Sequence, residues 1–348
     1  MSKRLILSAA FAVVAASSLA KAQEQTHAAA DFFATPAMKL LCTNTTTPTG
    51  RPGMWAIDRP SMAASETALF STMRLQPVAD GEYAIVKIDR AQPESLQELI
   101  RFRGRVHDLE YRDGKVFALF ADHLLVIDGE TGSVEKKVTT LAPAPGGDHH
   151  ADAQAMAWMG EKLVIVHGTR GLVVYDAKAG GMTFAHPLGL EAGGQITKAI
   201  EVSSLDENRV IIVVDNLTVR NEPPYPFNGL MVVDFKGSNF IERYAYDRKT
   251  SGTIANAIVK TAGDKIIINN WGVLQTTSLT TMKQAKKVDV AWQPLRIEVD
   301  GQPEYAQLMG EFFYEGGSIH ACAQVSYRNP ETGRPVHKGT ILVTPLLK

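Results

Sequence analysis

The sequence is poor in several features that mark particular classes of protein. Its 348 residues include only two cysteines, too few for a disulfide framework or a four-thiolate metal site. Lys and Arg number 36 against 37 acidic residues, so the formal net charge is −1 and no basic surplus for nucleic acid is present. Beyond the short apolar run near the N-terminus, which is described below, no segment has the ~18 uninterrupted apolar residues of a membrane-spanning helix. With 45% hydrophobic residues, the chain can still bury a sizeable core.

Several catalytic motifs are missing as well. The chain has no Gly-x-Ser-x-Gly nucleophile turn, no phosphate-binding Gly-x-x-x-x-Gly-Lys loop and no His-Glu-x-x-His helix. A Cys-x-x-Cys-His haem attachment is also absent. The sequence therefore predicts no particular cofactor with certainty. A divalent metal ion is the one candidate, and it is discussed below.

The first 22 residues are typical of a secretory signal peptide. Lys3 and Arg4 precede an apolar run from Leu5 to Ala16, and Ala20-Lys21-Ala22 offers the small residues of a cleavage site. Cleavage near Ala22 predicts a periplasmic or secreted protein without membrane insertion. It removes three basic and no acidic residues, giving 33 − 37 = −4 for the mature chain.

The two cysteines lie near opposite ends of the chain. Export would place Cys42 and Cys322 in an oxidising compartment, where a disulfide is permitted. The alternative is two buried thiols that pack as small apolar side chains. The sequence leaves both open.

From about residue 80 onward, short β-rich runs recur after polar turns. The first residues of five such runs, 116, 163, 210, 265 and 319, are spaced by 47, 47, 55 and 54 residues. This is the period of a four-stranded propeller blade with loop insertions.

A second run often ends in aspartate before a turn, as at Asp89, Asp128, Asp176 and Asp234. The carboxylate can accept backbone N–H bonds within that turn, which explains the repeat without catalysis. The segment from Val126 to Val134, with its Asp-x-x-Thr-Gly turn, resembles the repeat of quinoprotein-like and YVTN-type β-propellers. The resemblance implies the fold and no family function.

The repeats predict an all-β chain, in which residues 23–37 form a flexible segment and residues 38–348 a single β-propeller. Six four-stranded blades are expected, and seven remain possible if Pro60 to Leu75 contains further strands. The last blade is expected to begin near Tyr305 with three strands, and Met38 to Cys42 would supply its fourth strand and close the ring. The expected blades are 53–102, 104–141, 152–188, 196–246, 253–290 and 305–348.

Long insertions are expected on one face of the propeller. If strands are lettered A to D outward from the axis, the insertions at Asp215–Asn228 and Ser326–Lys338 both join strand B to strand C. Loops on a rigid scaffold are where binding residues are normally placed, so this face is predicted to bind. Its candidate contact residues are Arg220, Tyr225, Trp271 and Arg328.

The innermost strands should begin at the same face, around a central channel. Strand alternation places one polar residue per blade toward the channel. Aligning the blades gives the candidate ring Asp108, Gln154, Lys198, Asn256 and Gln307. Such a ring either holds water or forms a ligand pocket.

Histidines near the same rim suggest a metal site. His149, His150 and Asp152 lie in the loop that enters the third blade, and His107 enters the second. Imidazoles and carboxylates at this density can bind a zinc, manganese or calcium ion, although such a cluster also occurs in solvated loops.

Two functions from different classes follow. The first is an exported, monomeric binding propeller that holds a small molecule, a glycan or a partner protein on the B–C face and its funnel. The second is a metal-dependent hydrolase, lactonase or lyase, in which the His/Asp cluster holds the ion and His107 or Asp108 acts as general base.

Overall fold

A computed structural model describes the residues that carry the fold. They are residues 39–42, 61–74, 82–92, 96–142, 149–186, 197–216, 227–236, 241–246, 254, 257–270, 273–293, 295–299, 302–315, 318–328, 331, 333 and 335–345. Within these ranges, no helix has both the length and the apolar character needed to cross a bilayer.

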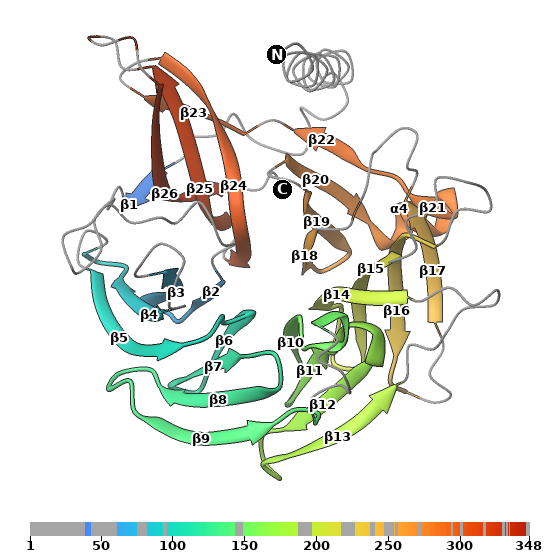
Figure 1. The fold of residues 1–348 in the computed structure, drawn as a ribbon. Coiled ribbons are helices and arrows are strands. Elements are labelled where there is room, and N and C mark those ends of the chain that lie inside the picture. The colour runs from blue at the N-terminus through green and yellow to red at the C-terminus, as the bar shows by residue number, and fades with distance from the viewer. Residues whose placement is uncertain are drawn as a thin grey trace, which may run out of the picture.

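The chain is a β-propeller: the sheets are arranged around a central axis (Figure 1). Five of them consist of short strands and have the form of blades. The first three sheets follow one another directly along the chain. The first sheet contains β2 (Met62–Ala64), β3 (Ala68–Arg74), β4 (Glu82–Asp89) and β5 (Leu96–Arg103). The second contains β6 (Asp108–Arg112), β7 (Lys115–Leu119), β8 (His123–Asp128) and β9 (Val134–Thr139). The third contains β10 (Ala155–Met159), β11 (Lys162–Val166), β12 (Leu172–Asp176) and β13 (Gly181–His186).

The fourth and fifth sheets depart slightly from this plan. The fourth contains β14 (Thr197–Ser204), β15 (Arg209–Asn216), β16 (Gly229–Asp234), β17 (Ile241–Tyr246) and β21 (Lys287–Val288); the fifth contains β18 (Ile258–Ala262), β19 (Lys265–Asn270), β20 (Val273–Ser278) and β22 (Ala291–Gln293). Strand β21 pairs in parallel with β17 and so ties the two sheets together at their outer edges.

The remaining sheet has a different form. Its order is β1 (Lys39–Cys42), β26 (Pro335–Pro345), β25 (Ser318–Arg328), β24 (Gln302–Glu315) and β23 (Leu295–Val299). Strands β24, β25 and β26, with 14, 11 and 11 residues, are the longest described, and the sheet extends outward in Figure 1. Strand β1 pairs antiparallel with β26 as the fifth strand of this sheet, whereas the segment from Met38 to Cys42 was expected to be its fourth. Five blade-like sheets and one long-stranded sheet thus stand where six similar blades were expected.

The strands form where β-branched and aliphatic residues run together. In β15, every residue from Val210 to Val214 is fully buried, because both faces of a propeller blade pack against a neighbouring blade. One hydrophobic cluster joins the third and fourth sheets, and another joins the fourth and fifth. The core therefore lies between the sheets and leaves the axis for other residues.

The aspartate turns have the structural role predicted for them. The Oδ1 atom of Asp128 accepts hydrogen bonds from the backbone N–H of Glu130 at 3.0 Å and of Thr131 at 2.7 Å. Asp176 caps its turn in the same way, accepting from the N–H groups of Lys178 and Ala179 at 2.9 Å. These aspartates hold turns, as predicted.

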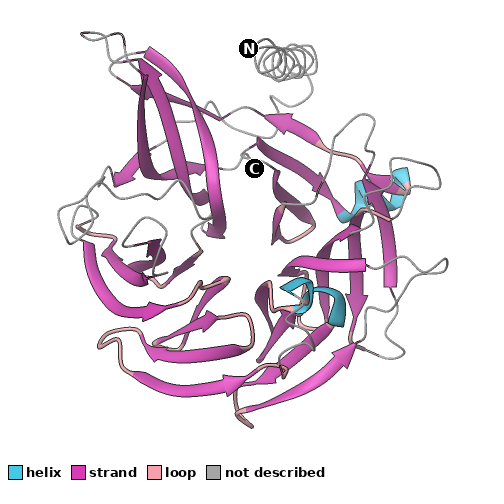
Figure 2. Cartoon of the chain, in the orientation of Figure 1, coloured by secondary structure: helices cyan, strands magenta, loops and turns pink. Residues whose placement is uncertain are grey.

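Three local details differ from the sequence prediction. Helix α4 (Leu279–Ala285) was not expected; it is capped by Ser278, whose Oγ accepts from Thr281 N at 3.0 Å, and it buries Leu279 and Met282 (Figure 2). Strand β23 adds a strand to the last sheet before Tyr305. Much of Ser326–Lys338, expected as a loop, belongs to β25 and β26, which pair as far as Arg328 and Pro335.

The strand register answers the question of the two cysteines. Cys42 on β1 and Cys322 on β25 both pair with Ile341 of β26, from opposite sides. Two interstrand spacings of ~4.8 Å place their Cα atoms about 9.6 Å apart. A disulfide needs Cα atoms within about 7 Å, so this arrangement does not allow the pair to bond.

Candidate functional site at the central channel

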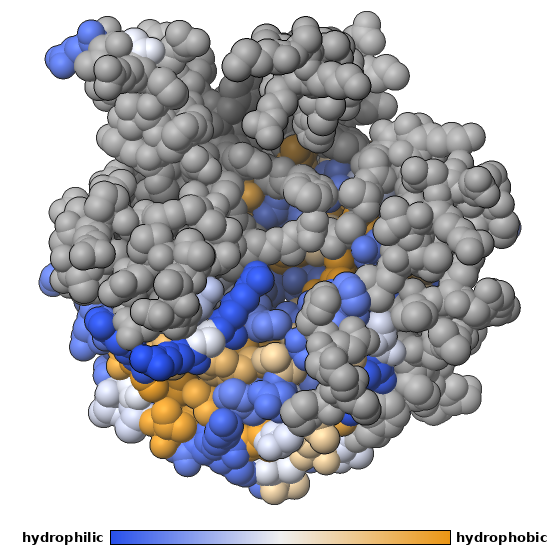
Figure 3. Space-filling view, viewed as in Figure 1, coloured by the Kyte–Doolittle hydropathy of each residue, from blue (hydrophilic) through white to orange (hydrophobic). Residues whose placement is uncertain are grey.

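Six strands surround the axis of the propeller. Strands β2, β6, β10, β14, β18 and β24 each contact the next, and β24 contacts β2 again. They bring side chains from distant parts of the chain to one place. On the face seen in Figure 3, the centre is hollowed and has both hydrophilic and hydrophobic residues at its bottom.

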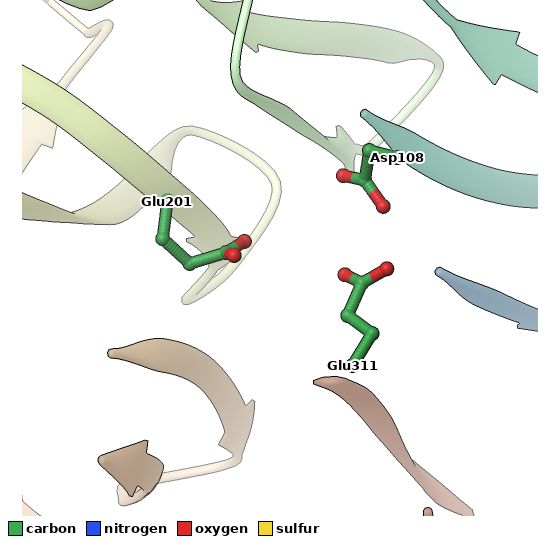
Figure 4. A group of neighbouring side chains, drawn as sticks. All are labelled: Asp108, Glu201 and Glu311. Atoms are coloured by element: carbon green, nitrogen blue, oxygen red, sulfur yellow. The ribbon is translucent and has the colours of Figure 1, made fainter. Parts of the chain in front are cut away.

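Three carboxyl groups from three of these strands meet at the axis. Asp108 of β6, Glu201 of β14 and Glu311 of β24 each offer a carboxylate oxygen, and these oxygens lie within 4.8 Å of one another (Figure 4). The three residues are only 1%, 6% and 3% exposed. Such a group of buried carboxyls needs compensation by protons, hydrogen bonds or a cation.

Most of that compensation comes from the neighbouring innermost strands. The ammonium Nζ of Lys260 on β18 lies 2.7 Å from Oε1 of Glu311. The backbone N–H of Met156 on β10 donates to Oδ2 of Asp108 at 2.7 Å, and Leu109 N–H donates to its Oδ1 at 2.7 Å. The cluster therefore joins strands of several sheets by charge-assisted hydrogen bonds.

Burial and charge shift the pKa values of these groups. Burial, then the charge of Glu311 and a hydrogen bond with it, raise the pKa of Asp108 well above its usual range. Burial raises the pKa of Glu110, two residues further along β6, to about 7. Burial alone would lower the pKa of Lys260, but Glu311, Glu201 and Asp108 outweigh it and raise that pKa. Lys260 thus stays charged.

A second set of titratable groups, including two histidines, lies at the mouth of the channel. His107, just before β6, has a pKa lowered by burial and by Arg105; Asp152 opposes this shift, and Lys198 on β14 adds to it. His167 lies between β11 and the short helix η3 (Gly168–Arg170); burial lowers its pKa to about 4. Both imidazoles are therefore neutral at pH 7.

Two short helices support this rim. Helix η2 (His149–Ala151) contacts η3, and both lie near the centre of the ring in Figure 2. The Nδ1 atom of His167 is 3.4 Å from the carbonyl oxygen of Ala151. The close approach of the two backbones also explains why residue 168 is a glycine. Gly168 has φ +48°, and a Cβ atom there would come 1.8 Å from the carbonyl oxygen of His150.

The structure brings several of the predicted binding residues together. Asp108 lies at the axis, and Asp152 and Lys198 each lie within electrostatic reach of His107, the residue before it. Gln154 is half-buried just before β10, and its Nε2 donates to the carbonyl oxygen of Asp152 at 3.0 Å.

Other predicted residues lie outside the described structure. Four of them, Arg220, Tyr225, Asn256 and Trp271, are outside the described residues altogether. Gln307 and Arg328 are placed on β24 and β25, and His149 on η2, without a description of their side chains. Their roles stay predictions.

The predicted metal ligands stay a prediction too. Among the described side chains, the acids and histidines that gather closely enough to hold an ion are Asp108, Glu201 and Glu311. Of these three, the sequence had placed only Asp108 in the channel. Carboxylate oxygens suit a hard cation such as Ca²⁺, but Lys260 already supplies a positive charge there.

The missed residues reach the axis because of irregularities in their strands. The register of β14 shifts between Ala199 and Glu201, and that of β24 shifts between Leu308 and Phe312. A bulge changes which residues face the axis, so simple alternation from Lys198 does not lead to Glu201, and Glu311 lies inside the irregular stretch of its strand. An acidic residue inside an innermost strand was the available signal.

Comparisons with known proteins give no closer identification. No family model matches the chain, and no curated protein matches it. Among solved structures, it is similar to the Neurospora crassa Pan2 WD40 domain, with TM-score 0.44 and 10% identity over 88% of this chain and 95% of that one. It is also similar to the N-terminal domain of Nup159, with TM-score 0.46 and 11% identity over 91% and 96% of the two chains. The fold assignment rests on the strand order described above.

Proposed function

We propose that this protein is an exported propeller that binds a ligand or partner protein at the mouth of its central channel, on the face of the B–C loops. One observation carries the proposal: Asp152 and Lys198, from two other parts of the ring, lie within electrostatic reach of His107. His107 directly precedes Asp108, which belongs to the buried cluster with Glu201 and Glu311. Polar and charged side chains held by a rigid scaffold are suited to selective binding.

The proposal includes the architecture and the location of the protein. We infer a six-bladed ring in which the long-stranded sheet is the sixth blade and β1 completes it; the contacts among the innermost strands and the pairing of β1 with β26 support this. Export rests on the signal-like residues 1–22, which lie outside the described residues. N-terminal sequencing of the protein from its own cells should begin at Gln23, and an intact Met1 terminus would contradict export.

A site-directed crosslinking experiment tests the binding face. A photoreactive amino acid replaces Lys198 at the channel mouth, and the matched control carries it at Lys236, an exposed lysine of the turn between β16 and β17 on the opposite face. In the native cells, crosslinks at position 198 should be lost when excess unlabelled mature protein is added. The absence of crosslinks at 198, or the same products at both positions, would overturn the proposal.

A metal-dependent hydrolase, lactonase or lyase is the second candidate. The convergence of Asp108, Glu201 and Glu311 favours it, since these carboxylates could hold a divalent cation that displaces Lys260. Calorimetric titration with Ca²⁺, Mn²⁺ and Zn²⁺ tests it. A site at the axis would be lost in Glu201→Gln, whereas a site at the predicted ligands His107, His149, His150 and Asp152 would be lost in His150→Ala.

A further inference from the structure

A second cavity lies away from the channel mouth, between the second and third sheets. Its volume is about 450 Å³, which is within the range of small-molecule sites. Its rim includes residues of the β6–β7, β10–β11 and β12–β13 turns, so it opens on the face opposite the B–C loops. It is therefore independent of the binding face proposed above.

Aromatic side chains from both sheets form the apolar part of this cavity. Phe117 of β7 packs edge-on against Trp158 of β10, with ring centroids 5.0 Å apart, and Tyr175 of β12 lies 6.4 Å from Phe117. Val126 of β8 completes the wall. A wall of this kind can contact the apolar body of a ligand.

The charged rim carries more positive than negative groups. Four cations, Arg112, Lys115, Lys136 and Lys178, line it together with three carboxylates, Asp113, Glu135 and Glu161. Arg112 pairs with Glu161 at 2.6 Å and lies 3.7 Å from Asp113, and Lys115 pairs with Glu135. Every carboxylate of the rim is thus engaged by a cation.

In the described part of the chain, the other two rim cations form no ion pair with a carboxylate of the rim. Lys136 donates to the carbonyl oxygen of Gly180, at 2.6 Å, and Lys178 lies within electrostatic reach of Asp176. With four cations and three carboxylates, the residues that line the cavity carry a net charge of 4 − 3 = +1. That surplus favours an anion.

Trp158 provides an independent observation. Its indole Nε1–H is buried and has no hydrogen-bond acceptor. An indole nitrogen is a donor only, so its missing partner must be an acceptor. Leaving such a donor unsatisfied costs about 1–3 kcal/mol, which an incoming oxygen atom would recover.

We propose that this cavity binds an organic acid, with its apolar body against the wall of Phe117, Trp158 and Tyr175. Its carboxylate is held by Lys136 and Lys178 and accepts the indole hydrogen of Trp158. A cationic ligand is disfavoured because Arg112 already lies 4.6 Å over the ring of Trp158 and Lys136 lies 5.9 Å from that of Tyr175.

The test uses 2-naphthoate as the probe and its neutral amide, 2-naphthamide, as the matched ligand control. The full mature protein is labelled with ¹⁵N, and the indole N–H signals of its four tryptophans are followed during titration. Trp158→Phe assigns the signal of Trp158, and calorimetry on the wild-type protein measures affinity even if that variant fails to fold.

We expect 2-naphthoate to move the Trp158 indole signal in a saturable way, and 2-naphthamide to bind at least 10-fold more weakly. The double variant Lys136→Gln/Lys178→Gln should lose at least 10-fold in affinity for 2-naphthoate, whereas Lys236→Gln, on the same face but in the fourth sheet, should bind normally. A fixed Trp158 signal, equal binding of acid and amide, or an unaffected double variant would overturn the proposal.

Discussion

A quantitative prediction concerns Glu110, which lies on β6 within electrostatic reach of Lys260 and Glu311. Its pKa is raised to about 7 by burial, from a reference value of 4.5. The folded protein therefore holds this proton more tightly than the unfolded chain. The resulting stabilisation is complete below pH 4.5 and is lost as the pH rises through 7. At 1.36 kcal/mol per pKa unit, the 2.5-unit difference amounts to about 3 kcal/mol.

Glu110→Gln removes this titration and keeps the shape of the side chain. We expect the free energy of unfolding of the variant, relative to wild type, to rise by about 3 kcal/mol between pH 4.5 and pH 8. Urea denaturation at half-unit pH intervals measures it. His167 affects stability in the opposite direction: its pKa is lowered to about 4, so its contribution to stability is lost as the pH falls. Because His167 is present in both proteins, this effect cancels when the variant is compared with wild type.

The control variant is Glu130→Gln, because the side chain of Glu130 is 78% exposed. Its stability should follow that of wild type across the same pH range. If Glu110→Gln also followed wild type to within 1 kcal/mol, the carboxyl would be hydrated in the folded protein and the raised pKa of Glu110 would be refuted.

Three further predictions concern other parts of the fold. Lys260→Met should destabilise the protein by about 3–5 kcal/mol in urea denaturation, because it leaves Glu311 buried without its cation; a loss below 1 kcal/mol would show that the ion pair is solvated. Ser278→Ala removes the cap of α4 and should cost about 1 kcal/mol in thermal unfolding, and an unchanged midpoint would contradict the capping role. Without reductant, denatured protein should take up two iodoacetamide groups by mass spectrometry, since Cys42 and Cys322 flank β26; a single species with no adduct would reveal a disulfide.

The blade repeat could be predicted from the sequence because each blade repeats its own local signals. Runs such as Val210–Val214 are apolar on both faces, and aspartates such as Asp128 cap the following turns. These signals depend on neighbouring residues only. The length of strands β24 to β26 was harder to predict from the sequence, because the polar residues at the ends of a long hairpin have the composition of a loop.

The axial site could be predicted only in part, since its geometry depends on strand irregularities. Strand alternation can point Asp108 toward the channel because β6 pairs with β7 without a register shift, and Asp108 lies with Glu201 and Glu311. Glu201 and Glu311 lie at register shifts, and the local composition does not indicate where such a shift occurs. Lys260 was missed for another reason: its role follows from the carboxylates around it, which come from other sheets.

The pairing of β1 with β26 also has a consequence for biosynthesis. These two strands lie about 300 residues apart in the chain, and yet they share hydrogen bonds at the edge of one sheet. On the ribosome, β1 emerges long before β26, so this sheet cannot be completed until β26 has been synthesised. Closing so long a loop is also slow, because its entropy cost precedes any contact that rewards it. Strand β1 therefore stays without its partner until β26 is available, and that interval is when a chaperone can still hold the chain unfolded.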